Sequence, residues 1–318
     1  MRRLFANAHY DFIGKRKLAY IISATALAVG LAAALIGQIR TGSWINYGVD
    51  FTGGTLVHVL APGGTEGDIR AIVESAVPGS SISRFGDDEE FQIRTPLPRG
   101  EGAAESSDAV IDALRARYPG LDVRSAEAVG SKVGGEMQTR ALLAILVSFV
   151  ATLIYIAFRF EWRFGVAAII ATAHDILLTL GILAILRLEV SLPTVAAVLT
   201  IVGYSLNDTI IIFDRIRENL RGARRQEFVT ILNRSINETL PRTVLTSVTT
   251  LVTLLSLFLF GGVIIRDFAL ILIVGILLGT YSSIFVAAPA LLEIEKRFPH
   301  EQKQVRRSRS PAARPSRV

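Results

Sequence analysis

The stretch that decides the fold is LPTVAAVLTIVGYSLNDTIIIFDRIREN, residues 192–219. Its apolar part is long enough to cross a membrane as a helix, which needs roughly 20 residues. Asn207 and Asp208 lie within it, and a charged segment begins at Asp214. A charge at the centre of a spanning helix costs about 2.5–3.5 kcal/mol on insertion scales, so Asp208 needs a reason to persist. That reason is either an ion or proton relay or an interhelical hydrogen bond that fixes packing.

The composition also indicates an integral membrane protein. Of the 318 residues, 51% are hydrophobic and only 19% are charged, and the mean hydropathy is +0.45. The net charge is +6, but the basic residues flank apolar runs, so orientation in a membrane explains them better than a nucleic-acid partner does. The chain has no cysteine, which excludes a disulfide framework, a thiolate metal site and thiol catalysis.

Six apolar segments are candidate transmembrane helices. The first, residues 18–37, follows a basic head of residues 1–17 and exceeds the apolar length of a signal peptide, so we expect an anchored helix. The other five belong to a helical bundle over residues 141–295: residues 141–158, 164–186, 192–213, 243–265 and 268–292. A polar, basic loop is expected at residues 214–242. The basic tail, residues 296–318, is expected to be disordered, and it either orients the chain or touches anionic lipid or ribosomal RNA.

Residues 38–140 differ from the rest, because charge and glycine are frequent and no spanning run occurs. Short apolar runs and helical spacing predict four strands and two helices: strands at 55–60, 81–85, 90–95 and 121–126, and helices at 65–76 and 107–118. The order βαββαβ is the split pattern of a ferredoxin-like α+β domain. Before it, Asp50 is followed by Gly53 and Gly54, which imply a turn or a close backbone approach. A nucleotide-binding loop is disfavoured, because no Lys-Ser/Thr pair follows these glycines.

The distribution of Lys and Arg predicts the orientation. With six spans both termini lie on one side, and that side carries 22 Lys and Arg residues in its head, tail and connections. The short turns of the opposite side hold only Arg187 and Arg266. The positive-inside rule therefore predicts a multi-pass membrane protein with both termini in the cytoplasm and the α+β domain outside.

A polar stripe marks the fifth span. Pro241 suits a helix start, where its missing N–H costs nothing. Polar residues then recur at steps of four and three along one helix face: Arg242, Thr246, Thr249, Thr253 and Ser256. Lipid does not reward such a face, so we expect it to contact protein or a wet cavity.

The depth of Asp208 favours a pairing with Arg242. Asp208 lies six residues before Asp214, which places it roughly 9 Å inside the cytoplasmic boundary at 1.5 Å per residue. Arg242 enters from the same side with a long side chain. The two are expected to meet, and a relay could couple proton uptake to breaking this pair.

The remaining spans hold two further pairs. His174 and Asp175 lie near the centre of the third span; as neighbours they point about 100° apart and are not expected to share a face. A His–Asp relay and a structural contact both remain open there. Gly275 and Gly279 form a small-xxx-small face that favours close helix packing. No catalytic or metal-ligand spacing is visible, so neither an enzyme nor a cofactor other than protons is expected.

Together these residues resemble the SecD/SecF family of protein-export membrane proteins, a branch of the resistance–nodulation–division superfamily. The segments that carry the resemblance are YGVDFTGGT at 47–55, HD at 174–175, VGYSLNDTIIIFDRIREN at 202–219, PRTVLTSVTT at 241–250 and RDFALILIVGILLGTYSS at 266–283. The resemblance implies a six-helix half that pairs with a SecD half. It also implies work beside the SecYEG channel on preproteins, with YajC as a further partner and the proton-motive force as energy source. The family's intramembrane Asp corresponds to Asp208 and its fifth-span Arg to Arg242.

Two other functions remain open. A transporter half that moves a lipid or a small solute would share the fold and the Asp, but we would expect a larger outer domain and a second six-helix repeat in the same chain. A non-conducting scaffold subunit of a translocase is the other, and it should tolerate Asn in place of Asp208.

Overall fold

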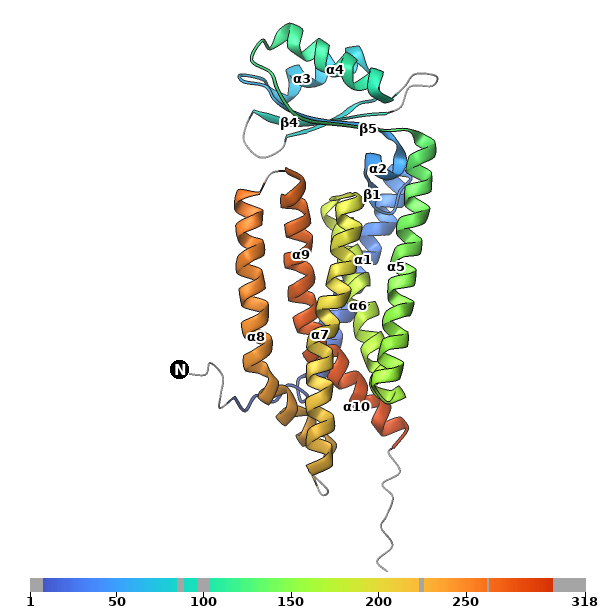
Figure 1. Cartoon of the computed structure of the whole chain (residues 1–318), viewed down its shortest axis with the longest axis vertical. Helices are drawn as coiled ribbons and strands as arrows, with labels where there is room; N and C mark the ends of the chain where they lie inside the picture. Colours follow the sequence, from blue (N-terminus) through green and yellow to red (C-terminus); the bar gives the residue numbers. More distant parts are fainter. Residues whose placement is uncertain (1–7, 85–88, 97–102, 223–225, 262, 300–318) are drawn as a thin grey trace, which may run out of the picture.

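In the computed structural model, a bundle of long helices carries a small α+β domain at one end (Figure 1). The structure describes residues 8–84, 89–96, 103–222, 226–261 and 263–299. Within these ranges six helices are long and apolar enough to cross a membrane. The predicted number of spans and the predicted class, an α-helical polytopic membrane protein, are therefore confirmed. The predictions for the ends of the chain fall partly outside the described residues, at residues 1–7 and 300–318.

The bundle is built from seven helices, two of which form one span. They are α1 (Arg16–Thr41), α5 (Ser131–Arg159), α6 (Trp162–Leu186), α7 (Leu192–Gly222), α8 (Phe228–Phe260), α9 (Val263–Ser282) and α10 (Ala288–Arg297). A π-helical segment, Ser283–Ala287, joins α9 to α10, and Pro289 follows it in the first turn of α10. Proline lacks the N–H that an unbroken α-helix would use here, so the regular hydrogen-bond pattern is interrupted at this point.

The loop predicted at residues 214–242 is wrong, because most of this segment is helical. α7 continues to Gly222 and α8 begins at Phe228, so Pro241 lies inside α8 rather than at a helix start. The polar composition of this segment indicates contact with water. A helix that extends beyond the membrane is also in contact with water, so composition alone does not distinguish it from a loop. The estimated depth of Asp208 below the cytoplasmic boundary assumed that the chain leaves the membrane at Asp214. Because the helix continues past Asp214, this estimate no longer has a fixed starting point.

Polar side chains hold the extensions of α7 and α8 together. Arg215 Nε donates to Glu238 Oε2 at 2.6 Å. The segment before α1 joins them, because Asn233 Oδ1 accepts the backbone N–H of Ile13 at 3.0 Å, and Ile13 is fully buried. These contacts join parts of the chain that are far apart in sequence, which is why local composition did not predict the helices.

The α+β domain has the predicted βαββαβ order. Its strands are β2 (Gly54–Leu60), β3 (Ser81–Arg84), β4 (Glu90–Thr95) and β5 (Asp122–Val129), and its helices are α3 (Glu66–Ala76) and α4 (Ala103–Arg117). The sheet is antiparallel in the order β3-β4-β2-β5. Both helices cover one face of the sheet, and the other face is turned toward the ends of the bundle helices (Figure 1). Val57, Phe91 and Leu114 belong to the core between sheet and helices.

Short elements connect the domain to the bundle. They are α2 (Val49–Thr52) and a parallel pair of strands, β1 (Asn46–Tyr47) and β6 (Glu189–Val190). The close backbone approach predicted for Gly53 and Gly54 is confirmed. Both have positive φ, 76° and 123°, and a Cβ on Gly54 would lie 2.5 Å from the carbonyl oxygen of Thr95. α5 begins earlier than predicted and packs on α2, where a Cβ on Gly134 would lie 2.9 Å from the backbone N of Gly53.

Candidate functional site

Asp208 is buried in the helix bundle without a partner. Its exposed fraction is 0%, and it lies on the inner face of α7 with Ser205 and Thr209, each 1% exposed. Among the described residues, neither carboxylate oxygen of Asp208 has a hydrogen-bond partner. A bare carboxylate in an apolar interior is costly unless it binds a proton or meets a cation. The position therefore fits a group that changes its charge state.

The predicted ion pair between Asp208 and Arg242 is absent from the described part of the chain. α8 is continuous through Pro241, and Thr243 and Ser247 face the interior of the bundle, with exposed fractions of 1% and 5%. Arg242 then lies on the exposed side of α8. Its positive charge still acts on Asp208 from there. The structure thus places the two near each other but unpaired.

The polar stripe of α8 lies on the outside of the chain, so the protein that we expect it to contact is not another helix of this bundle. Thr246 is half-buried, and the other members are exposed: Arg242, Thr249, Thr253 and Ser256. The hydroxyls bond within the helix; Thr249 Oγ1, for example, donates to the carbonyl of Leu245 at 2.9 Å. Each hydroxyl proton is therefore used within α8, and the outer surface of the helix is only weakly polar.

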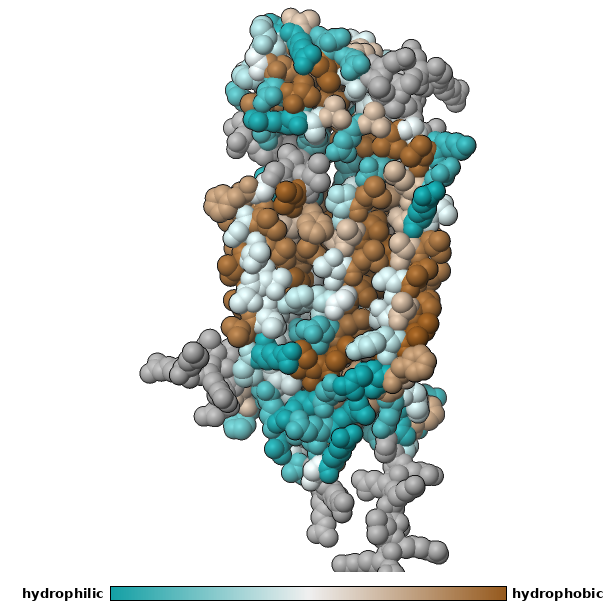
Figure 2. Space-filling view, in the orientation of Figure 1, coloured by the Kyte–Doolittle hydropathy of each residue, from teal (hydrophilic) through white to brown (hydrophobic). Residues whose placement is uncertain are grey.

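A second stripe of small or polar residues is exposed on α7: Ala196, Thr200, Gly203 and Asn207. Asn207 therefore points away from Asp208, to the outside. Figure 2 shows pale residues running down the part of the bundle where α7 and α8 lie, between brown hydrophobic surfaces. We call the stripes of α7 and α8 together the polar membrane face.

His174 and Asp175 meet directly, contrary to the expectation that they point apart. His174 Nδ1 lies 3.0 Å from Asp175 Oδ1, and their exposed fractions are 7% and 1%. Asp175 Oδ2 accepts the hydroxyls of Ser205 at 2.5 Å and Ser282 at 2.6 Å. The Cβ directions of neighbouring helix residues do differ, but the long imidazole reaches back to the carboxylate. Asp175 is thus saturated with hydrogen bonds where Asp208 has none.

Glycines bring the helices of this network together. The close packing predicted for Gly275 and Gly279 is confirmed, since a Cβ on Gly275 would overlap Ile201 and one on Gly279 would lie 2.9 Å from Ser205 Cβ. α9 therefore approaches α7 closely enough for both serines to reach Asp175. A similar contact between Gly30 of α1 and Gly181 of α6, 2.8 Å for an added Cβ, was not predicted. Each helix contributes a single glycine to this contact, so no repeat of small residues along the sequence indicates it.

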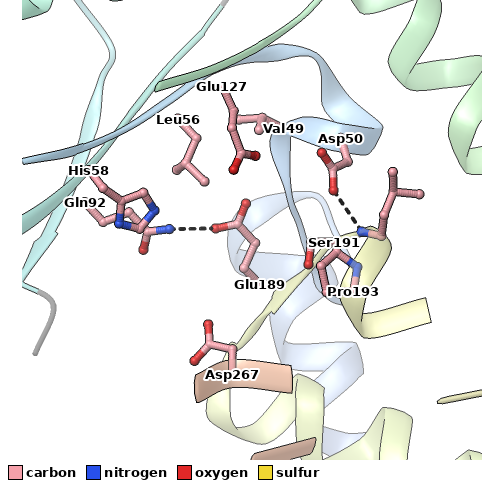
Figure 3. Close-up of a pocket in the computed structure, with 11 residues that line it drawn as sticks. Val49, Asp50, Leu56, His58, Gln92, Glu127, Glu189, Ser191, Pro193 and Asp267 are labelled. Atoms are coloured by element: carbon pink, nitrogen blue, oxygen red, sulfur yellow. Dashed lines mark hydrogen bonds between the residues drawn. The ribbon is translucent and has the colours of Figure 1, made fainter. Parts of the chain in front are cut away.

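A cavity of about 250 Å³ lies where the α+β domain meets the ends of α7 and α9 (Figure 3). Four carboxylates line it: Asp50, Glu127, Glu189 and Asp267. Glu127 from β5 and Asp267 from α9 approach it from opposite sides, with Glu189 between them. Asp50 Oδ2 accepts the backbone N–H of Leu192 at 2.8 Å and so caps the first turn of α7.

The charges around the cavity are unevenly compensated. Arg94 forms an ion pair with Glu189. Burial raises the pKa of Glu127, and the negative charges of Asp50 and Glu189 raise it further. Burial lowers the pKa of His58, another lining residue. Sequence reasoning missed this cluster, because its members come from strands and helices that only the fold brings together. No group of His, Asp and Glu in the described residues is arranged to hold a metal ion.

The fold and the site define a multi-pass membrane protein with a buried, unpaired acid in its bundle. Residues 109–297 match the family model of the protein export membrane protein SecD/SecF, C-terminal. The chain is 42% identical over 312 residues to the protein translocase subunit SecF of Gemmatimonas aurantiaca, covering 94% of this chain and 91% of that protein. The chain therefore belongs to the SecD/SecF family of protein export membrane proteins, and it is a protein translocase subunit.

A longer relative and two solved structures also support membership of this family. The protein translocase subunit SecDF of Thermus thermophilus is 40% identical over 299 residues, which cover 92% of this chain but only 39% of that protein. The crystal structure of SecDF from that organism, described as a translocon-associated membrane protein, matches with a TM-score of 0.80 at 38% identity, over 92% of this chain and 39% of that one. A SecDF structure in a super-membrane-facing form matches with a TM-score of 0.65 over the same shares.

Proposed function

We propose that this chain is one half of a SecD–SecF complex that uses the proton-motive force to assist preprotein translocation through SecYEG. The observation that carries the proposal is the carboxylate of Asp208, which is fully buried in a membrane-spanning helix and has no hydrogen-bond partner among the described residues. Intramembrane acids of this kind mark proton relays. Protons are then the coupling ion, and no other cofactor is required.

The polar membrane face supports a partner half. Thr200 and Gly203 of α7 and Thr249 of α8 are exposed at the depth of the bundle, where lipid tails gain nothing from small or hydroxylated side chains. Such surfaces pack well against another helix. A SecD half would cover this face, and the relative whose name joins SecD and SecF in one chain fits that arrangement. SecYEG and YajC would bind elsewhere on the complex.

The charge distribution supports the direction of the chain in the inner membrane. The basic extensions of α7 and α8 lie at the end of the bundle opposite the α+β domain (Figure 1). Under the positive-inside rule, that end and both termini are cytoplasmic, and the domain is periplasmic. The domain would then contact preproteins as they emerge from the channel.

A change in the charge of Asp208 would couple the proton gradient to movement. Arg242 lies on the edge of the polar membrane face with no ion-pair partner among the described residues, and its charge acts on Asp208 across the α7–α8 contact. Protonation of Asp208 removes that attraction and lets the helices shift. One charge crossing the membrane field supplies about 2.3 kcal/mol per 100 mV. Since about 1.4 kcal/mol is a factor of ten, this is enough to shift a two-state equilibrium by more than tenfold.

Export by the Asp208→Asn variant tests the proposal. Asn nearly keeps the shape of Asp, so we expect normal expression and normal recovery with SecD, but loss of the export benefit in cells depleted of the native protein. Asp214→Asn is the matched control, because Asp214 lies on the same helix with 41% of its side chain exposed. Full export by Asp208→Asn would contradict the relay and leave a non-conducting scaffold.

A further inference from the structure

The hydrogen bonds around His174 have only one consistent direction. Tyr281 Oη lies 3.0 Å from the carbonyl oxygen of Ala19, which can only accept, so Tyr281 donates its single proton there. Ser23 Oγ lies 3.2 Å from Tyr281 Oη and must therefore be the donor in that contact. With its proton used, Ser23 accepts from His174 Nε2, which lies 3.0 Å away. His174 thus carries a proton on Nε2.

The state of the His174–Asp175 contact follows from this. With Nε2 protonated, the 3.0 Å contact between Nδ1 and Asp175 Oδ1 needs a proton of its own, on one atom or the other. Without it, two lone pairs would face each other and a net negative charge would be buried in the bundle. The pair therefore holds one shared proton and is neutral overall. The other side chains that hydrogen-bond to the pair are uncharged: Ser23, Ser205 and Ser282.

The pair is linked to the helix that carries Asp208. Ser205 of α7 donates to Asp175 Oδ2 at 2.5 Å, and it precedes Asp208 by three residues. Three residues are roughly 4.5 Å of helix rise, and both side chains lie on the buried face. Any shift of α7 against α6 and α9 has to break the Ser205–Asp175 bond.

We propose that Asp175 and His174 are positioning residues for Asp208, which hold α7 in place and release it by moving one proton within the pair. When Ser205 leaves, the Nδ1–H bond of His174 breaks and an Oδ1–H bond forms on Asp175. The imidazolium becomes neutral imidazole, and the carboxylate becomes a neutral acid. No proton enters or leaves the pair, so its release costs no buried charge.

Nitrogen NMR of the histidine rings tests the protonation directly and without any assay of transport. The chain has 4 histidines, so ¹⁵N-histidine in the full-length chain in lipid gives few signals, and His174→Gln assigns the one of interest. From the direction of these hydrogen bonds we expect His174 Nε2 to carry a proton at neutral pH. An unprotonated Nε2 at neutral pH would overturn the inference.

A tyrosine variant tests whether Tyr281 sets the direction of the hydrogen bond between Ser23 and His174. In Tyr281→Phe, Ser23 no longer has to donate to residue 281 and is free to donate to His174 Nε2, so a signal from unprotonated Nε2 should appear. Tyr204→Phe is the matched control, since in the part of the chain that the structure describes Tyr204 Oη bonds only to Thr250, at 3.4 Å. If Tyr281→Phe retains a fully protonated Nε2, as Tyr204→Phe should, the assigned direction is wrong.

The positioning role rests on the proposed function and is tested by His174→Gln. Gln retains a donor for Ser23 but has no proton to pass to Asp175. We expect normal recovery of the complex and a fall in export of about tenfold or more. Wild-type export by an assembled His174→Gln complex would contradict the role. If Asp208→Asn also exports normally, the proposed function fails as well, and the NMR result then decides the inference alone.

Discussion

At the scale of single residues, two buried acids of the bundle are in opposite situations. Asp175 accepts hydrogen bonds from His174, Ser205 and Ser282, whereas Asp208 has none among the described residues. The sequence singled out both acids, because charge inside an apolar run is visible without a structure. It could not distinguish them, since their partners lie on other helices.

Replacing each acid by Asn should have opposite effects on stability. Asp175 accepts three hydrogen bonds, and an Asn amide cannot accept them all, so Asp175→Asn leaves a buried hydroxyl or the imidazole without a partner. We expect the free energy of unfolding to fall by about 1–3 kcal/mol. Asp208→Asn breaks no hydrogen bond among the described residues and removes an ionisable group from the buried face, so we expect unchanged or higher stability. Thermal unfolding in mild detergent, with Asp214→Asn as a control, measures both. Equal destabilisation by the two variants would contradict this difference.

At the scale of elements, apolar length predicted the helices in the membrane and failed outside it. α7 and α8 extend beyond their apolar parts because Arg215 and Glu238, and Asn233 and the segment before α1, bond across them. The strand at residues 90–95 was predicted correctly, and in the structure it alternates, with Phe91, Ile93 and Thr95 buried. The side of α8 that faces inward depends on its packing, which local periodicity does not contain.

The polar membrane face should be an interface and not a lipid contact. Gly203 has open space around it, with no atom within 4 Å of an added Cβ. Gly203→Leu should therefore leave the fold of the isolated chain intact but block close packing of a SecD half, and lower its recovery about tenfold. Val147→Leu on α5, where Val147 is 57% exposed among apolar neighbours, is the control. Undiminished recovery of SecD with Gly203→Leu would place the partner on another face.

At the scale of the whole molecule, the cavity of Figure 3 is where the α+β domain and the bundle meet. Asp50 bonds to the first turn of α7, and Arg94 of β4 pairs with Glu189 of β6. Together with the packing of α5 on α2, these contacts can transmit movements of the bundle to the domain. The surplus of carboxylates makes the contact sensitive to protons on that side of the membrane.

The stability of this contact should fall as the pH rises, because of Glu127. Burial and the charges of Asp50 and Glu189 raise its pKa above 4.5, so the folded state keeps the proton at pH values where the unfolded chain has lost it. Its effect is absent below about pH 4 and becomes unfavourable as the pH rises through the elevated pKa. His58 acts oppositely, since its lowered pKa makes stability fall below about pH 6.5.

Glu127→Gln should remove the first of these effects and keep the second. We expect slower hydrogen exchange of β5 amides than in the wild type near pH 7, and equal exchange protection near about pH 4, where Glu127 is protonated in both states. Glu136→Gln, at an exposed position on α5 with 55% of its side chain accessible, should follow the wild type throughout. A Glu127→Gln curve parallel to the wild type over the whole range would show that the cavity exerts no electrostatic strain on the contact. Convergence of the two curves only at acid pH would identify Glu127 as the group that weakens the contact between domain and bundle.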